Sequence, residues 1–277
     1  MSETKECSHN CNECGSKCSD RKETQSFLVS SNTGSHVKKV IGIVSGKGGV
    51  GKSLVTSLLA TSMRKRNYSC AILDADITGP SIPKMFGLKE KAQTDSVGIF
   101  PAESKNGIKV MSLNLLLDND TDPVVWRGPV IASTVKQFWS DVYWNDVDYM
   151  FVDMPPGTSD VPLTAFQSFP LDGIVVVTSP QELVSMVVEK AINMAQSMDI
   201  KVLGLIENMS YVECPNCNEK IEIFGKSHIN EVSERYGLPV LAKIPMRQTV
   251  AASADDGTME DLEIPEIKDA VSFIEGK

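Results

Sequence analysis

The segment SGKGGVGKS, residues 45–53, constrains the fold of this chain more than any other stretch. It follows VIGIVSG, a short apolar run that starts at Val40 and predicts a buried strand. The apolar spacing of residues 52–66 predicts a helix directly behind it. A strand, a glycine-rich loop and a helix in this order predict a phosphate-binding loop. The glycines let backbone N–H groups approach the phosphates, and the helix N-terminus adds partial positive charge.

The residues of this loop have separate expected roles. Lys52 is expected to reach the β- and γ-phosphates of a nucleotide, and Ser53 is expected to ligate Mg²⁺. The positions expected to line the nucleotide are Gly46, Lys47, Gly48, Gly49, Val50, Gly51, Lys52, Ser53 and Leu54. The alternative is a glycine-rich turn without a ligand. The general motif does not require Lys47, and a solvated surface lysine is one interpretation of that residue.

The remaining apolar segments predict the fold class. Further strands are expected at 69–76, 108–114, 149–155, 173–180, 201–208 and 238–245. Helices are expected at 128–141, 181–198 and 226–236, with one more short helix within 260–277. These strands are continuously apolar, which is typical of parallel strands covered on both faces. The alternation therefore predicts an α/β domain over residues 38–277, with a doubly wound, mostly parallel sheet and helices on both faces.

Polar residues follow several of the predicted strands. Asp153 ends the apolar run of YMFVDMP, where a carboxylate can hold Mg²⁺ directly or through water. The next segment, PPGTSD, predicts a switch loop whose Gly157 N–H can approach the γ-phosphate. Asp74 and Asp76 end the strand LDAD, and one of the two can simply cap the loop. Asn208 ends the strand before MS and is either a base-reading residue or a turn residue.

Two cysteines follow the Asn208 strand in the sequence CPNC. Cys214 and Cys217 supply two thiolates, whereas Zn²⁺ and iron–sulfur clusters usually take four ligands. Two copies of the chain would supply four, which predicts one [4Fe–4S] cluster bridging a homodimer. Half of a zinc ribbon and a redox dithiol are the alternatives. Cys70 lies within a predicted buried strand and is expected to be a small core residue.

The other four cysteines lie in a polar N-terminal segment, residues 1–37, that is expected to be disordered without metal. They are Cys7, Cys11, Cys14 and Cys18, with His9 as a possible substitute ligand. Four thiolates this close together can enclose one cluster or one Zn²⁺. Their spacing is near a ferredoxin run without matching it. A metal-free tail is the alternative.

Charge and hydropathy indicate which classes of partner and which cellular compartment to expect. The net charge of −9 argues against nucleic acid, because non-specific binding to it depends on Lys and Arg neutralising phosphates. No apolar run approaches the roughly 20 residues of a membrane-spanning helix. The N-terminus MSETKECSHNC lacks a signal-peptide core, so a cytoplasmic protein is expected. In a reducing compartment the seven cysteines favour metal or redox chemistry over disulfides.

The motifs GKGGVGKS, LDADITGPSIPKMFG, WRGP, DMPPGTSD, IENMS and CPNC occur together and in this order. This combination resembles the Mrp/Nbp-type P-loop ATPases, the cytosolic iron–sulfur cluster carriers within the MinD/ParA superfamily with a deviant Walker A loop. The resemblance covers about residues 38–260. Eukaryotic relatives of the Nbp branch also carry an N-terminal four-cysteine cluster, with a wider spacing than the set here.

The resemblance implies roles for several residues. It implies that ATP is the nucleotide, and that Lys47 reaches the phosphates of the other subunit's nucleotide, where a second cation stabilises developing charge as an arginine finger does. It also implies that Asp76 orients the attacking water and that Asn208 reads the adenine edge. The family often has Asp where this chain has Met246, which leaves the nucleotide contacts of residues 245–249 open.

Three functions fit the resemblance to different degrees. The first is an ATPase that holds a cluster between two subunits and transfers it to apo-proteins. The second is a MinD/ParA-like nucleotide switch with a structural zinc at Cys214 and Cys217, although the acidic C-terminus lacks the basic amphipathic pattern of a membrane-binding helix. The third is an electron donor like the nitrogenase iron protein, which takes its cluster ligands from widely separated cysteines. We favour the first.

Overall fold

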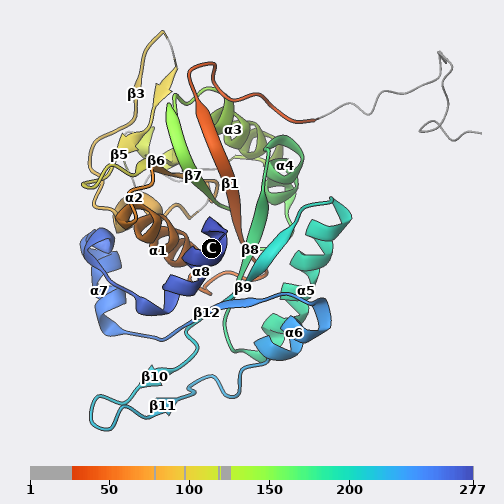
Figure 1. Ribbon diagram of the computed structural model, residues 1–277. Helices are drawn as coiled ribbons and strands as arrows, with labels where there is room; N and C mark the ends of the chain where they lie inside the picture. The colour runs from red at the N-terminus through yellow and green to blue at the C-terminus, as the bar shows by residue number, and fades with distance from the viewer. Residues whose placement is uncertain (1–26, 78, 97, 118, 120–125, 277) are drawn as a thin grey trace, which may run out of the picture.

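The computed structural model describes residues 27–276 except positions 78, 97, 118 and 120–125. An eight-stranded sheet forms its centre, in the order β12-β9-β8-β1-β7-β2-β6-β5 (Figure 1). The strands are β1 (His36–Ser45), β2 (Cys70–Asp74), β5 (Ala102–Glu103), β6 (Lys109–Met111), β7 (Asp146–Asp153), β8 (Gly173–Thr178), β9 (Val202–Asn208) and β12 (Val240–Ile244). Neighbours pair in parallel except at the β5–β6 edge, so the predicted mostly parallel sheet is confirmed.

Helices cover both faces of this sheet. They are α1 (Lys52–Lys65), α2 (Ile82–Met85), α3 (Gly128–Ser140), α4 (Asp160–Ser168), α5 (Glu182–Ser197), α6 (Ile229–Tyr236), α7 (Gln248–Asp256) and α8 (Lys268–Glu275). Short 3₁₀ turns lie at Leu113–Leu115, Met259–Asp261 and Pro265–Ile267. α3 to α6 lie on one side of the sheet, and α1 and α8 lie on the other (Figure 1).

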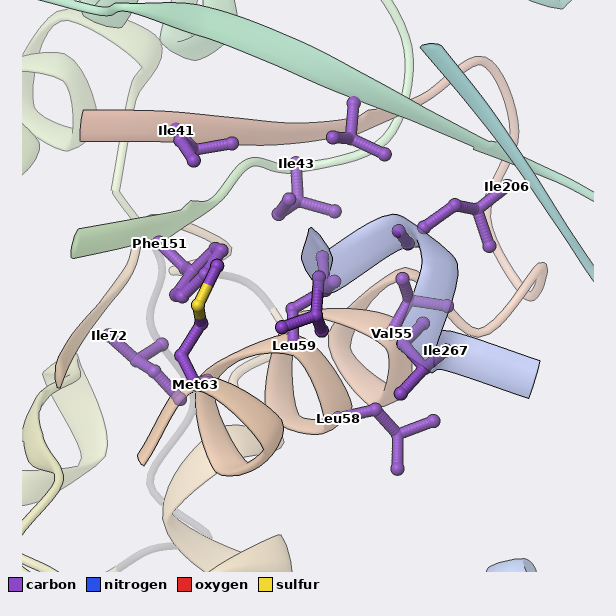
Figure 2. Close-up of a cluster of buried hydrophobic side chains, with 14 of the residues drawn as sticks. Ile41, Ile43, Val55, Leu58, Leu59, Met63, Ile72, Phe151, Ile206 and Ile267 are labelled. Carbon is purple, nitrogen blue, oxygen red and sulfur yellow. The ribbon is translucent and has the colours of Figure 1, made fainter. Parts of the chain in front are cut away.

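The two faces form two separate hydrophobic cores. Along β1, Val40 and Val44 belong to the core under α3 to α6, whereas Ile41 and Ile43 belong to the core under α1. Successive strand residues point to opposite faces, so one continuous apolar strand supplies both cores. Figure 2 shows the second core, where Leu59 of α1 packs among side chains of the sheet and of the C-terminal region. The doubly wound α/β prediction is therefore confirmed.

Element boundaries differ from the sequence expectation where burial is incomplete. β1 begins at His36 rather than Val40, because its first residues alternate between exposed and half-exposed positions and carry no apolar run. The helix expected from residue 226 begins at Ile229, whose N–H is accepted by the Ser227 hydroxyl. The sequence did not predict α2, α4 and α7, which are short and lie inside loop-like segments.

Among the described residues, two small antiparallel pairs lie outside the main sheet. They are β3 (Gln93–Thr94) with β4 (Ile99–Phe100), and β10 (Val212–Glu213) with β11 (Lys220–Ile221). The second pair carries the CPNC segment and extends away from the sheet (Figure 1). We call residues 211–226 the cysteine hairpin.

The described part of the N-terminal segment is attached to the domain. The Val29 N–H donates to the Ser168 carbonyl, and the indole N–H of Trp139 donates to the Val29 carbonyl. The segment therefore enters β1 along α3 and α4. Among the helices of the described residues, none is both long and apolar enough to cross a membrane.

Candidate functional site

The phosphate loop connects β1 to α1 and requires glycine at specific positions. Gly49 and Gly51 have φ of 81° and 79°, in the left-handed region that residues with a Cβ rarely adopt. A Cβ at Gly51 would also lie 2.1 Å from Asn208 Nδ2, and one at Gly46 would lie 2.6 Å from the Val187 backbone. Larger residues would not fit at these positions. The loop leads directly into the N-terminus of the 14-residue helix α1, and a helix N-terminus is a favourable position for phosphate groups.

Behind the loop, Asp153 gathers the polar side chains of the site. The Lys52 ammonium lies 2.8 Å from Asp153 Oδ1 and 4.0 Å from Asp76 Oδ2. The Ser53 hydroxyl donates to Asp153 Oδ2 at 2.6 Å, and the Thr56 hydroxyl donates to Oδ1 at 2.7 Å. Because Asp153 is fully buried, these donors compensate a charge that would otherwise be costly. The Ser53 hydroxyl and the Asp153 carboxylate are oxygen ligands of the kind that Mg²⁺ prefers, so the donor set fits Mg²⁺ bound with a nucleotide.

Asp74 and Asp76 lie at the end of β2 and differ in exposure. Asp74 is buried, accepts a hydrogen bond from Ser112 Oγ at 3.0 Å, and accepts the Asp76 N–H at 3.2 Å. Burial and the nearby Asp153 charge raise the pKa of Asp74 to about 8. The Asp76 side chain is partly exposed, and its carboxylate faces Lys52. Of the two carboxylates, Asp76 is therefore the one open to the site.

Lys47 and Gly157 lie at the mouth of the site. Lys47 is exposed, and its ammonium lies 3.1 Å from Gln181 Oε1, directly before α5. Gly157 has φ of 84°, and its N–H donates to the Ser45 carbonyl at 2.8 Å. In this structure the Gly157 N–H, which the sequence assigns to the γ-phosphate, thus bonds to the end of β1.

Asn208 and the loop after β12 complete the nucleotide side of the site. The Asn208 amide is buried and donates to the Val50 carbonyl at 3.0 Å, so here it contacts the phosphate loop. Met246 is 39% exposed, and its N–H donates to the Tyr211 carbonyl. Arg247 pairs with Glu266 through both of its terminal nitrogens. The loop after β12 is therefore joined to the base of the cysteine hairpin.

The cysteine hairpin follows the carboxyl end of β9 and carries two free thiols. Cys214 is half-buried and Cys217 is exposed. Hydrogen bonds from the backbone N–H groups of Asn216 and Cys217, and from the Cys217 side chain, lower the pKa of Cys214. The thiolate of Cys214 therefore forms more readily than that of an ordinary cysteine, and thiolates bind soft metal ions and iron–sulfur clusters.

Two thiols do not complete a metal site. Within the part of the chain that the structure describes, no three His, Cys, Asp or Glu side chains cluster so as to hold a metal ion. Cys70 is buried in β2, where burial raises its pKa to about 12, so it is the core residue expected from the sequence. Cys7, Cys11, Cys14 and Cys18, together with His9, lie outside the described residues.

Three residues of this region were missed by sequence reasoning. Thr56 holds Asp153 from the second turn of α1, three positions after Ser53, and this helical spacing could have suggested it. Ser112 reaches Asp74 from a segment distant in sequence, and no local pattern indicates that contact. Glu207 is buried beside Asn208, and a charged residue ending an apolar strand was the available signal.

Comparison with known proteins identifies the family. The family model described as ParA, NUBPL iron-transfer P-loop NTPase, matches residues 36–275. The chain belongs to this family. An iron-sulfur cluster carrier protein of Clostridium perfringens is 43% identical to this NTPase over 82% of each chain. One of Methanocaldococcus jannaschii is 42% identical over 91% of this chain and 89% of its own.

Solved structures agree with the fold. A nucleotide-binding protein of Archaeoglobus fulgidus in complex with ADP superposes with a TM-score of 0.75 at 42% identity, covering 83% of this chain and 90% of that one. The MinD cell division protein of Aquifex aeolicus superposes with a TM-score of 0.60 at 20% identity, covering 86% and 98%. The second similarity shows the shared fold alone. This NTPase thus has the MinD/ParA-like architecture.

Proposed function

We propose that this NTPase binds and hydrolyses ATP with Mg²⁺, holds one [4Fe–4S] cluster between two subunits, and transfers that cluster to apo-proteins. The observation that carries the proposal is the cysteine hairpin. It presents Cys214 and Cys217 on a projecting turn, with the pKa of Cys214 lowered by N–H groups. A cluster takes four thiolates and one hairpin supplies two, so a second copy completes the set. The names of the relatives as iron-sulfur cluster carrier proteins support this assignment.

The nucleotide chemistry is assigned to residues of the described site. The loop from Gly46 to Leu54 holds the phosphates through its backbone N–H groups, Lys52 neutralises their charge, and Ser53 and Asp153 hold Mg²⁺. Asp76, which faces Lys52, orients the attacking water. Turnover is slow and is coupled to cluster binding or transfer.

Lys47, Gly157 and Asn208 act where the nucleotide meets its surroundings. Lys47 leaves Gln181 and reaches the nucleotide of the second subunit, which couples hydrolysis to the geometry of the dimer. Gly157 turns its N–H to the γ-phosphate, and Asn208 lies beside the base. For these roles, Gly157 must exchange its hydrogen bond to the Ser45 carbonyl, and Asn208 its hydrogen bond to the Val50 carbonyl, for contacts with the nucleotide.

The N-terminal cysteines form a second metal site in this proposal. Cys7, Cys11, Cys14 and Cys18 hold a metal or cluster separate from the shared one, within the segment 1–37. The protein acts in the cytoplasm, in line with a 43% identical relative of Schizosaccharomyces japonicus named a probable cytosolic Fe-S cluster assembly factor. Nucleic acid and membranes are not among the proposed partners.

Metal analysis of cysteine variants tests the shared cluster. The parent is the full-length chain with Cys7, Cys11, Cys14 and Cys18 changed to serine, purified without oxygen. A shared [4Fe–4S] cluster predicts about two irons and two sulfides per subunit. Cys214→Ala and Cys217→Ala should each lose both while retaining ATP binding. Cys70→Ala is the matched control, because its thiol is buried away from the hairpin, and it should keep the full content.

A structural zinc is the second candidate at this site, since the same turn geometry and four thiolates also suit Zn²⁺. Zinc at about half an atom per subunit, without sulfide, would replace the carrier proposal by a MinD/ParA-like nucleotide switch. Full iron content in either hairpin variant would exclude Cys214 and Cys217 as the cluster ligands.

A further inference from the structure

The two ends of the cysteine hairpin are bound to one buried carboxylate. Glu207, the next-to-last residue of β9, is only 1% exposed. Its Oε2 accepts the hydroxyl of Ser210 at 2.5 Å, and its Oε1 accepts the hydroxyl of Ser227 at 2.5 Å. Ser210 directly precedes the hairpin and Ser227 directly follows it. Hydrogen bonds to a carboxylate are short and stronger than neutral ones, and a buried carboxylate depends on them.

The neighbouring residue reaches the phosphate loop from the opposite face of the sheet. Consecutive strand residues point to opposite faces. Leu205 packs into the core with α5 and α6, and Ile206 packs into the core with α1. Glu207 accordingly lies on the side of α6, while the Asn208 amide donates to the Val50 carbonyl on the side of α1. The last two residues of β9 therefore hold the hairpin and the phosphate loop at once.

The rest of the hairpin has few attachments of this kind. Residues 215–223 are exposed, and the thiols lie on that part of the chain or next to it. Near the base, the Tyr211 carbonyl accepts the Met246 N–H, and Glu213 lies 3.6 Å from Arg247 at the surface. A surface ion pair contributes little. The orientation of the thiols relative to the sheet is thus set mainly at the buried base.

We propose that Glu207 is a positioning residue that couples the phosphate loop to the two thiols. Nucleotide binding changes the contact between Asn208 and the phosphate loop, and Glu207 passes the resulting movement of the end of β9 to Ser210 and Ser227 together, which reorients the hairpin as a unit. The proposal rests on the proposed function for its biological meaning, because the thiols are there the cluster ligands. It adds a route by which the nucleotide controls their presentation.

Thiol labelling in the metal-free, reduced protein tests the coupling without any cluster. The parent is again the full-length chain with the four N-terminal cysteines changed to serine. Iodoacetamide labelling of Cys214 and Cys217 is followed by mass spectrometry, with and without a non-hydrolysable ATP analogue and Mg²⁺. We expect the nucleotide to change the labelling rate at least about fivefold, the lower end of typical coupling between sites. Cys70 is buried and serves as the internal standard for the folded state.

Substitutions at Glu207 then separate positioning from simple stability. Glu207→Ala should reduce the nucleotide effect to less than about twofold, below the range of typical coupling, while the analogue still binds. Glu207→Gln, which can accept one serine hydroxyl and donate to the other oxygen, should restore most of the effect. Glu222→Ala removes an exposed carboxylate from the same hairpin and should retain the full effect. If Glu207→Ala does not fold, Ser227→Ala removes one attachment and should reduce the effect by itself.

Two results would overturn the coupling. One is a labelling rate in the parent that does not respond to the nucleotide. The other is a full response that persists in folded Glu207→Ala or, where that variant does not fold, in Ser227→Ala. The iron and sulfide content of the same parent distinguishes this failure from failure of the cluster carrier proposal, since it depends on the thiols being present and not on their response to nucleotide.

Discussion

At the scale of single residues, the site depends on how buried charges are compensated. Asp153 is fully buried, and one ammonium and two hydroxyl groups contact its oxygens. Lys52 therefore neutralises Asp153 in this structure, and in the proposed function it also neutralises the phosphates. Lys47 is exposed, and its ammonium donates a hydrogen bond to the Gln181 side chain. The two lysines of the loop should respond differently to substitution.

Removing Lys47 should slow ATP hydrolysis about a hundredfold, as loss of one transition-state donor typically does, with little change in the Kd for ATP. Lys52→Ala should weaken ATP binding itself and lower stability, because it leaves Asp153 without its cation. Single-turnover hydrolysis and equilibrium binding measure the two effects. Lys105→Ala, which removes a surface ion pair in the turn before β6, should change neither. Normal turnover in Lys47→Ala would contradict its proposed role.

Asp74 should make the stability of the nucleotide-free protein depend on pH. Its pKa is raised to about 8 in the folded state, so between its ordinary pKa and 8 the folded chain binds a proton that the unfolded chain has released. The free energy of unfolding should therefore fall as the pH rises through this window, by at most about 1.4 kcal/mol per pH unit. Asp74→Asn should remove this slope, and Asp146→Asn, an exposed control, should retain it. Denaturant titrations between pH 5 and 8 measure this free energy. If it changes with pH equally in Asp74→Asn and in the natural protein, the assignment is contradicted.

The residues with local signatures could be predicted from the sequence, and those held by distant contacts could not. GKGGVGKS needs its glycines for backbone geometry and its lysine for charge, so the motif indicates its own surroundings. The C-x₂-C spacing likewise marks Cys214 and Cys217 as a pair of candidate ligands without any knowledge of the fold. Ser112 contacts Asp74, and Ser227 contacts Glu207, across long sequence separations, and no local pattern indicates these two contacts.

At the scale of elements, the end of β9 and the phosphate loop pack without free space. Asn208 Nδ2 would lie 2.1 Å from a Cβ at Gly51, whereas a Cβ at Gly157 would meet nothing within 4 Å. Both glycines have positive φ, so both tolerate a side chain poorly. Substitution by alanine therefore strains the backbone at both positions, and at Gly51 it also creates a collision with Asn208.

Gly157→Ala should cost about 1–2 kcal/mol of stability, which is the backbone strain alone. Gly51→Ala should cost more, and Asn208→Ala should relieve the excess by about 1 kcal/mol or more in a double-mutant cycle. The free energy of unfolding of the nucleotide-free variants provides the measurement. Additive effects of Gly51→Ala and Asn208→Ala would show that the two elements are not in tight contact.

The element boundaries show where sequence patterns lose information. Continuous apolar strands such as β8, buried along its whole length, were recognised because both faces of the sheet are covered. The exposed start of β1 was missed because its alternating residues lack an apolar run. α2, α4 and α7 were missed because short helices are stabilised mainly by packing and not by propensity.

At the scale of the whole molecule, the phosphate loop and the cysteine hairpin both follow the carboxyl ends of strands of the main sheet. β1 ends at the phosphate loop, β7 ends at Asp153, and β9 ends at the residues that join the loop to the hairpin. Parallel strands bring their ends to one edge of the sheet, which is where ligands bind in doubly wound folds. A second subunit meeting this edge would bring together two nucleotides and two pairs of thiols.

Native mass spectrometry of the full-length chain tests this arrangement most directly. The chain carries serine at positions 7, 11, 14 and 18 and is purified without oxygen with its cluster. We expect a dimer that carries a single [4Fe–4S] cluster for two subunits, and a monomer without iron for Cys214→Ala. A monomer that carries a complete cluster, or a dimer that carries zinc in its place, would contradict the claim that two subunits share one cluster through Cys214 and Cys217.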